Sequence, residues 1–458
     1  MPPNRTFTYC EGVPSWNPAT YIADTDLHER AEAFLAKDNL QSAIAVSFSL
    51  PPPRRDPYVY HAIVSVTLPE VQHVISLGGQ NGLHAWYRGP APSVDESSDD
   101  KNIPQPQLQP QLQPQVLPPP PQQDTDAYLS IFDPATATPS ALKTFLSNAK
   151  KGSLRAEIAA YLHAKRYLHP ALAAQLTIPK RAAAKKPSAA NNKVPPNPYL
   201  TYLNWAARAL EWAGPSASSV RAGNMAHHAL PILMHHFGCA CPSHESLEIL
   251  RLLAAGREVL DMGSGGGYWT FMLRAYGVRC APVDSAQSAW RVTWVPDTVI
   301  ADGAEFLRER RKTQARPRSA VAGNGNKKDN ADSVVDPDEA VLLLVYPIVG
   351  GEIAGGKEGG FTRSMIDAYA GDTLAVVGTQ NHNGYTGFRG MSMDEYMERE
   401  RAHEGWVKVV QIALPSFPGK DEALFVFQRG SRAPAKDTSA TVSNVNDSNV
   451  NSSNKEGT

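Results

Sequence analysis

A nine-residue stretch at positions 259–267, Val-Leu-Asp-Met-Gly-Ser-Gly-Gly-Gly, limits what this chain can fold into more than any other part of it. The apolar residues ahead of the glycines predict a buried β-strand, and residues 268–275 predict a helix directly behind them. Glycine has no Cβ, so the backbone between these elements can bend tightly and lie close to a flat ligand. The first N–H groups of the helix can bind a polar or anionic group. The stretch therefore predicts a strand–turn–helix unit that faces a ligand, although a glycine-rich loop without a ligand is the alternative.

The spacing of the glycines separates two classes of ligand. Dinucleotide-binding folds require G-x-G-x-x-G, whose third glycine would fall on Tyr268 or Thr270 in this chain. The observed spacing is G-x-G-x-G, with an acid two residues ahead of the first glycine. This pattern resembles motif I of the class I S-adenosylmethionine (SAM) dependent methyltransferases, in which the turn wraps the methionine part of SAM and the acid faces its ammonium group. The resemblance implies that SAM is the cofactor and that it contacts Asp261, Gly263, Ser264, Gly265 and Gly267.

Two further acids follow at the ends of short apolar segments. Asp284 lies about twenty residues beyond the glycine turn, which is the distance one βαβ half requires. A carboxylate there can accept hydrogen bonds from both hydroxyls of a ribose, and by resemblance Asp284 is the ribose ligand; a surface acid at a strand end is the alternative. The segment that ends in Ala-Asp302-Gly303 resembles the third motif of the family, which implies contact of Asp302 and Gly303 with the adenine.

The remaining apolar runs predict the fold class. Residues 340–346 and 372–378 are nearly continuous in apolar residues, as is typical of parallel strands buried on both faces. Residues 406–414 and 422–428 predict a final hairpin, and the family inserts its last strand antiparallel. With helices expected at 361–369 and 392–404, the sequence predicts an α/β fold with a doubly wound, seven-stranded sheet. The resemblance covers about residues 226–430, and two tryptophan-containing segments, 265–269 and 290–294, resemble an uncharacterised fungal and microbial methyltransferase-like group.

Composition divides the rest of the chain. Residues 1–92 predict a small mixed α/β module with a helix at 26–37 and strands at 42–50, 58–67 and 73–77. Residues 93–126 form a Pro/Gln-rich linker, which is a spacer or a ligand for a partner with a proline-binding groove. Residues 127–225 predict a helical region that leads into the methyltransferase-like domain at 226–430. A polar insertion at 313–337 and a tail at 431–458 predict disorder, and the moderate hydrophobic share of 42% agrees with long disordered segments.

Candidates for chemistry lie after the predicted strands. Tyr346 follows the fourth strand where relatives that methylate amino groups often carry Asn/Asp-Pro-Pro-aromatic, and the missing amide disfavours adenine or glutamine as acceptor. His382 follows the fifth strand and is a candidate general base, with a loop histidine bonded to backbone as the alternative. The C-x-C pair Cys239 and Cys241, with His244, lacks the usual zinc spacing and a second cysteine pair, so no metal site is predicted.

Charge and hydropathy limit the partners. The net charge is −1, which implies no general affinity for nucleic acid or anionic lipid, and no apolar run predicts a membrane helix or a signal peptide. We therefore expect a cytoplasmic protein, with the basic segment around residues 308–312 allowing a nuclear location. The predicted function is methyl transfer from SAM to an unidentified acceptor. The alternative is a catalytically inactive SAM-binding or scaffold protein of the same fold.

Overall fold

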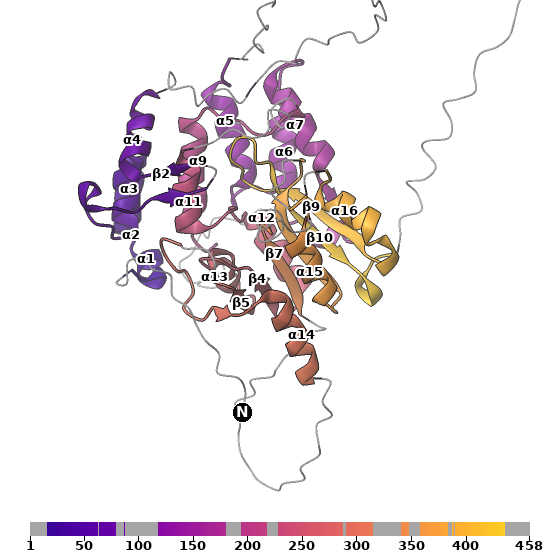
Figure 1. Ribbon diagram of the computed structural model, residues 1–458. Helices are drawn as coiled ribbons and strands as arrows, with labels where there is room; N and C mark the ends of the chain where they lie inside the picture. Colours follow the sequence, from indigo (N-terminus) through magenta and orange to yellow (C-terminus); the bar gives the residue numbers. More distant parts are fainter. Residues whose placement is uncertain are drawn as a thin grey trace, which may run out of the picture.

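The computed structural model describes residues 16–62, 64–78, 87, 118–179, 194–217, 228–286, 290–314, 340–347, 358–382, 387–388 and 390–435 (Figure 1). The proline-rich part of the predicted linker at 93–117, most of the predicted insertion and the tail from 436 lie outside the described residues. The expected ends of two of these segments fall inside helices. Helix α5 (Gln122–Leu129) begins within the range expected for the linker, and α14 (Gly303–Gln314) runs two residues into the expected insertion.

A mixed sheet forms the centre of the molecule, and eight of the described strands belong to it. Its spatial order is β3-β9-β10-β8-β7-β4-β5-β6. The central strands β8, β7, β4, β5 and β6 pair in parallel, whereas β10 is antiparallel to both of its neighbours. The strands are β3 (Tyr167–Leu168), β4 (Val259–Met262), β5 (Cys280–Asp284), β6 (Val299–Ile300), β7 (Val341–Val345), β8 (Thr373–Thr379), β9 (Val407–Ala413) and β10 (Glu422–Gln428). The doubly wound sheet with its antiparallel last strand is confirmed, and the short strand β3 from the helical region adds an eighth member at the edge.

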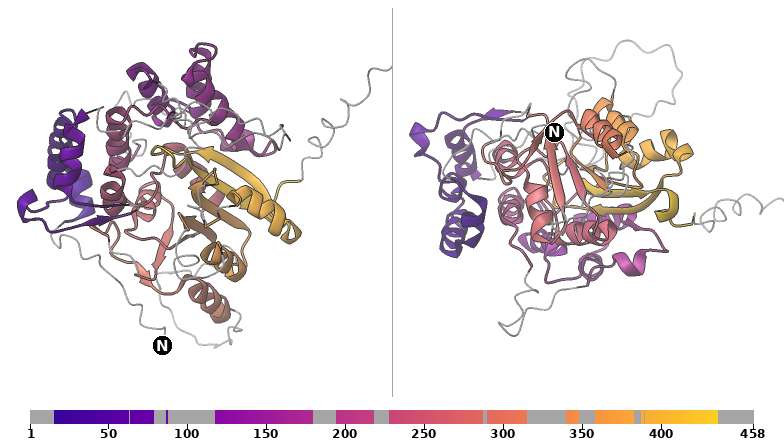
Figure 2. Two further views of the ribbon diagram at one scale, coloured as in Figure 1. Left: turned by 45° about the horizontal axis from the view of Figure 1, so that its top comes forward. Right: turned by 90° about the horizontal axis from the view of Figure 1, so that it is seen from below.

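Alternating side chains of the parallel strands enter two separate cores. In β7, Val341 and Leu343 face one core, whereas Leu342 and Leu344 face the other, as the two-residue period of a strand requires. Helices α14, α15 (Gly360–Ala368) and α16 (Met393–Glu400) cover the second core. Figure 2 shows the sheet between the two helical layers. The first core is covered by α5, η3 (Ser130–Phe132), α6 (Thr138–Ser147), α7 (Leu154–Lys165), α8 (Ala173–Leu176), α9 (Pro198–Ala209), α11 (Ala229–Phe237), α12 (His244–Ala254) and α13 (Tyr268–Ala275).

The order of the strands reverses at β4. From β4 the chain moves outward through β5 and β6, and it then returns to the other side of β4 to form β7 and β8. Crossovers leave β4 and β7 in opposite directions at such a point, which opens a crevice at the carboxyl ends of the strands. The glycine turn that follows β4 therefore lies where ligands bind in open α/β sheets.

Between residues 16 and 78, the described part of the chain differs from the prediction. The helix predicted at 26–37 is α2 (Thr25–Leu35), and the segment 58–67 forms the short paired strands β1 (Tyr60–His61) and β2 (Ser65–Val66). The strands predicted at 42–50 and 73–77 are wrong, because these segments form α3 (Leu40–Ser47) and α4 (Leu68–Ser76). Capping side chains stabilise the start of both helices. The Asn39 side chain accepts a hydrogen bond from the backbone of α3, and Thr67 and Glu70 form a capping box at the start of α4.

These helices pack on the rest of the molecule through aromatic rings. Helices α1 (Pro18–Ala23) to α4 lie together beside α9 and α11 (Figure 1). The Phe48 ring stacks on His236 with 4.1 Å between centroids, and Trp16 meets the edge of Trp294 at 5.0 Å. The same hydrophobic core thus runs from the N-terminal helices to the central sheet. Smaller elements complete the structure: η1 (Pro53–Arg55), η5 (Ala402–Glu404) and η6 (Gly430–Arg432).

Candidate active site

A cavity of ≈ 220 Å³ lies at the reversal of the strand order. Its floor is the end of β4 and the glycine turn. Further lining comes from the ends of β5 and β6, from the end of β7, and from residues 237–239 at the end of α11. The eight predicted cofactor ligands come from three short segments of the chain, and all eight line this cavity: Asp261, Gly263, Ser264, Gly265, Gly267, Asp284, Asp302 and Gly303.

Asp261 is a buried carboxylate at the floor of the cavity. Its side chain is 0% exposed, and its Oδ2 accepts a hydrogen bond of 2.7 Å from the Thr270 hydroxyl on α13. Its Oδ1 is buried with no hydrogen-bond partner among the described residues. Burial raises the pKa of Asp261 to about 6, and the nearby Asp284 carboxylate adds to this rise. A buried acceptor without a donor is unfavourable, so the site is suited to a ligand that brings a positively charged donor.

At two of the three glycines of the turn, neighbouring side chains leave no room for a Cβ. Gly263, Gly265 and Gly267 all have positive φ, at 75°, 56° and 79°. A Cβ at Gly265 would lie 2.5 Å from Cζ2 of Trp290, and one at Gly267 would lie 2.3 Å from Cγ2 of Val295. The loop between β5 and β6 therefore presses directly onto the turn. Gly263 differs, since its nearest neighbour would be Cζ of Phe361 at 3.4 Å, an ordinary contact.

The other two acids already hold the backbone of the site. Oδ2 of Asp284 accepts a 2.9 Å hydrogen bond from the N–H of Gly265, and its Oδ1 accepts one of 2.6 Å from Ala286. Asp302 accepts a 2.9 Å hydrogen bond from the N–H of Glu305 and so caps α14. A carboxylate has about four acceptor positions, so each of the two acids has acceptor capacity left. Their roles as ribose and adenine ligands stay predictions.

Two more polar groups at the cavity are buried and unpaired among the described residues. These are the Ser264 hydroxyl and the indole Nε1 of Trp290. Together with Asp261 they place an acceptor and two donors on one cavity. The structure places the Trp290 ring against the glycine turn.

Tyr346 lies at the end of β7 and lines the cavity. Its φ is +55°, a conformation that is uncommon for a bulky residue and that concentrates at functional sites. Its hydroxyl donates a 3.3 Å hydrogen bond to Oε1 of Glu422, and the ammonium of Lys420 lies 4.9 Å from the centre of its ring. The structure thus brings this predicted residue to the site together with two charged residues that the sequence analysis did not single out.

His382 is placed differently. It does not line the cavity, its side chain is 54% exposed, and its Nε2 lies 3.0 Å from Oε2 of Glu395 at the start of α16. Its role as a general base stays a prediction without support from this geometry. The residues that sequence reasoning missed are Lys420 and Glu422; the only signal was a Lys-Asp-Glu triplet directly ahead of an apolar strand.

The cysteines near α12 are held by local packing. Cys241 is buried, and its Sγ lies 3.5 Å from the carbonyl oxygen of Pro242. Nδ1 of His244 is hydrogen-bonded to the Tyr276 hydroxyl at 2.9 Å. Within the described ranges, no group of three or more His, Cys, Asp or Glu side chains is arranged to hold a metal ion. In the same ranges, no helix is both long and apolar enough to cross a bilayer.

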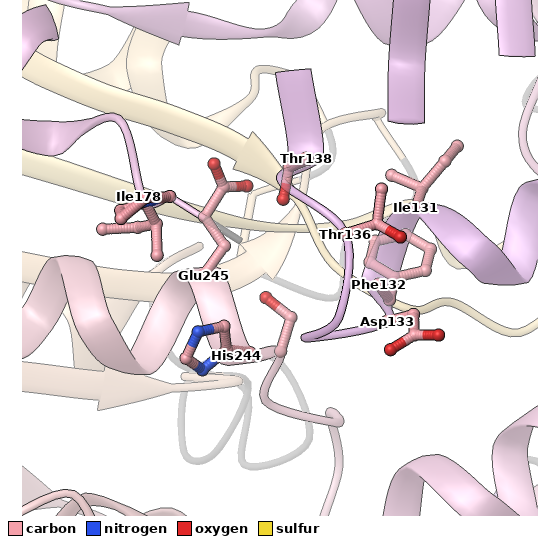
Figure 3. Close-up of a pocket in the computed structure, with 10 residues that line it drawn as sticks. Ile131, Phe132, Asp133, Thr136, Thr138, Ile178, His244 and Glu245 are labelled. Carbon is pink, nitrogen blue, oxygen red and sulfur yellow. The ribbon is translucent and has the colours of Figure 1, made fainter. Parts of the chain in front are cut away.

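A second hollow lies between η3 and the start of α12 (Figure 3). Its volume is ≈ 10 Å³, which is about the space of one water molecule. Glu245 on its wall is already bound by Arg166, with N–O distances of 2.6 and 3.0 Å. The hollow is therefore a seam between helices and not a ligand site.

The strand order and the antiparallel β10 give this chain the fold of the class I SAM-dependent methyltransferases. No family model matches the sequence, and no curated protein matches it. The solved structures that are similar to this chain include three methyltransferases of low sequence identity. A Streptococcus mutans protein named for SAM-dependent methyltransferase activity is 12% identical over 38% of this chain and 45% of its own length, with a TM-score of 0.24. The match therefore spans less than half of that protein.

The other two similar structures were solved with S-adenosylhomocysteine (SAH) bound. The 1,6-didemethyltoxoflavin-N1-methyltransferase of Burkholderia thailandensis is 14% identical over 41% of this chain and 77% of its own, with a TM-score of 0.25. The magnesium protoporphyrin IX methyltransferase of Synechocystis PCC 6803 is 11% identical over 40% of this chain and 83% of its own, with a TM-score of 0.24. Similarity this distant does not bear on the substrate of this chain.

Proposed function

We propose that this protein is a SAM-dependent methyltransferase. The observation that carries the proposal is the buried Asp261 carboxylate, whose unpartnered Oδ1 lies at the floor of a cavity formed by the glycine turn. The ammonium of the SAM amino-acid group would supply the charged donor that this oxygen lacks. The position of the cavity at the reversal of the strand order supports the same assignment.

The lining residues fit the rest of the cofactor. Asp261 and the glycine turn would hold the amino-acid end, Asp284 the ribose hydroxyls, and Asp302 with Gly303 the adenine. SAM supplies a methyl group that its sulfonium already activates, so the protein has mainly to place an acceptor in line with it.

Cavity residues outside the predicted cofactor ligands could contact the methyl acceptor. Tyr346, Phe237 and Cys239 also line the cavity, and none of them is among the predicted cofactor ligands. An aromatic ring and half-buried sulfur exclude water, and the Tyr346 hydroxyl offers one polar contact to an acceptor. The acceptor itself is open among protein, RNA, lipid and small metabolite.

Titration of the purified protein with SAH by calorimetry tests the cofactor. We expect Asp261→Asn to weaken binding by about 2 kcal/mol, roughly 30-fold, because a neutral amide replaces the charged acceptor. Asp421→Asn is the matched control, since Asp421 is equally buried at the same edge of the sheet but does not line the cavity. Both variants remove a buried carboxylate of raised pKa, and Asp421→Asn does so outside the cavity, so it controls for the loss of a buried charge.

The outcomes separate the possible functions. Absence of SAH binding by the folded protein would refute the proposal and favour a scaffold role. Binding that is lost in Asp261→Asn establishes the cofactor. Transfer of a labelled methyl group from SAM to a component of a cell extract then distinguishes an enzyme from a protein that binds SAM without turnover.

A further inference from the structure

Three consecutive charged residues are buried behind Tyr346. Lys420, Asp421 and Glu422 are 4%, 1% and 2% exposed. Glu422 is the first residue of β10 and pairs with Thr379 at the end of β8, so it lies at the same edge of the sheet as the cavity. Charged side chains are almost never buried this deeply without a specific role or partner.

The two carboxylates of this triplet differ in their partners. Asp421 accepts hydrogen bonds from the Tyr161 hydroxyl at 2.5 Å and from Nε2 of Gln380 at 2.9 Å, and these contacts account for its burial. Glu422 accepts a hydrogen bond from the Tyr346 hydroxyl, at 3.3 Å from its Oε1, and a hydrogen bond with the Ser416 side chain lowers its pKa; its Oε2 is buried with no hydrogen-bond partner among the described residues. Glu422 is therefore the carboxylate that contacts a residue of the cavity wall and keeps acceptor capacity free.

The surroundings of Glu422 make it titrate near neutrality. Burial raises the pKa of Glu422 to about 7, Lys420 opposes the rise, and Asp421 adds to it. Tyr128 of α5, Tyr199 of α9, and Cys239 and Cys241 after α11 also face it, and burial raises the pKa of each. These phenols and thiols stay protonated at neutral pH, so they add no charge that competes with the carboxylate.

We propose that Glu422 is a positioning residue for methyl transfer: it orients the Tyr346 hydroxyl, and it accepts the proton of that hydroxyl when the hydroxyl oxygen takes a proton from the acceptor. The inference rests on the proposed function. The acceptor atom forms its bond to the methyl carbon as the methyl–sulfur bond breaks and its electron pair stays on sulfur. The acceptor proton passes to Oη of Tyr346 while the Tyr346 proton passes to Glu422, so the positive sulfonium and the negative carboxylate are both neutralised.

The geometry fits this sequence of transfers. Tyr346 lines the cavity and its hydroxyl is hydrogen-bonded to Glu422, and the 3.3 Å separation is long for an O–H···O bond, as catalytic hydrogen bonds often are before a ligand tightens them. His382, the base expected from the sequence, is exposed on the surface and has no such connection.

The test compares the protons released when SAM and when SAH bind, measured by calorimetry at pH 7 in buffers of different ionisation enthalpy. Both ligands carry the same ammonium group, so effects on Asp261 cancel in the difference. Only SAM carries the sulfonium charge, which favours the ionised form of a nearby carboxyl. We expect SAM to release up to roughly half a proton more than SAH, because a group with a pKa near 7 is half protonated at this pH.

Variants show which residue causes the difference in proton release between SAM and SAH. Glu422→Gln should abolish it, whereas Asp421→Asn, equally buried but bonded to Tyr161, should retain it. Tyr346→Phe provides a second variant should Glu422→Gln fail to fold: the carboxylate loses its donor, so the pH of the greatest difference should move upward. Equal proton release by the two ligands, a difference that survives in Glu422→Gln, or an unmoved profile in Tyr346→Phe would overturn the inference. Absence of binding by either ligand would instead overturn the proposed function on which it rests.

Discussion

Binding and stability make opposite demands on Asp261. Its carboxylate is fully buried, and the Thr270 hydroxyl satisfies only one of its two oxygens. Because burial raises its pKa to about 6, the folded protein holds a proton here over a pH range in which the unfolded chain has released it. The free energy of unfolding therefore falls as the pH rises from about 4 through 6. The residue that would bind the cofactor thus destabilises the protein without ligand at neutral pH.

Replacing Asp261 by Asn should accordingly stabilise the unliganded protein at pH 8. The asparagine keeps an acceptor for Thr270 and removes the buried charge, which accounts for on the order of 3 kcal/mol between pH 4 and pH 8. Thermal unfolding of the wild type and of Asp261→Asn across this range measures the effect. The gain should shrink toward pH 4, where the wild-type carboxyl is also neutral. A gain that is constant with pH, or a loss of stability at pH 8, would show that the charge is not the cause.

At the scale of elements, a strand or helix was predictable where a few neighbouring residues determine it. The strand–turn–helix unit was predictable because its determinants lie within a few residues, and α13 has the predicted bounds Tyr268–Ala275. The strands predicted at 42–50 and 73–77 were wrong because apolar residues such as Ile44 and Val71 lie on the buried face of short, capped helices instead. In α3 the buried residues Leu40, Ala43, Ile44 and Ser47 follow the three-to-four residue spacing of a helix face.

The site shows the same division between local and distant determinants. The sequence motifs could point to Asp261, Asp284 and Asp302, because each lies within its own strand or two residues beyond it. They could not identify Glu422, which reaches the cavity wall only because β10 inserts beside β8 and contacts Tyr346 across 76 positions of sequence. They also could not show that Gly265 is required by the Trp290 ring, since this contact joins a turn to a loop of another βαβ unit.

The glycine turn as an element leads to a prediction with an internal control. Gly265→Ala should weaken SAH binding by tenfold or more, because a Cβ 2.5 Å from Cζ2 of Trp290 must displace the ring that presses on the turn. Gly277→Ala has the same left-handed strain, with φ of 76° against 56°, and no atom within 4 Å of its added Cβ. Both variants should lose about 1 kcal/mol of stability from backbone strain alone. If calorimetry shows equal affinities for the two variants, the contact with Trp290 does not shape the site.

At the scale of the whole molecule, the N-terminal helices and the cavity are joined through the loop that carries Trp290. Nη2 of Arg291 binds both carboxylate oxygens of Asp56, at 2.9 and 3.0 Å, and its guanidinium lies 4.2 Å from the centre of the Tyr58 ring. The two side chains of this ion pair are only 7% and 5% exposed. The backbone N–H of Arg291 also donates to the carbonyl of His235 at 2.8 Å. The residue next to Trp290 is thus held from two sides, by the N-terminal region and by α11.

Asp56→Asn tests whether this attachment serves the site. Removing one partner of a buried ion pair leaves the Arg291 charge uncompensated and should cost about 3 kcal/mol of stability. We also expect weaker SAH binding and altered tryptophan fluorescence, because Arg291 no longer fixes the loop that holds Trp290 on the glycine turn. Ile44→Ala is the control for destabilisation alone, since it opens a cavity of comparable cost in α3 without touching the loop. If calorimetry below the unfolding temperature shows that both variants bind SAH as the wild type does, the N-terminal helices stabilise the fold without shaping the cofactor site. A loss confined to Asp56→Asn would make them part of that site.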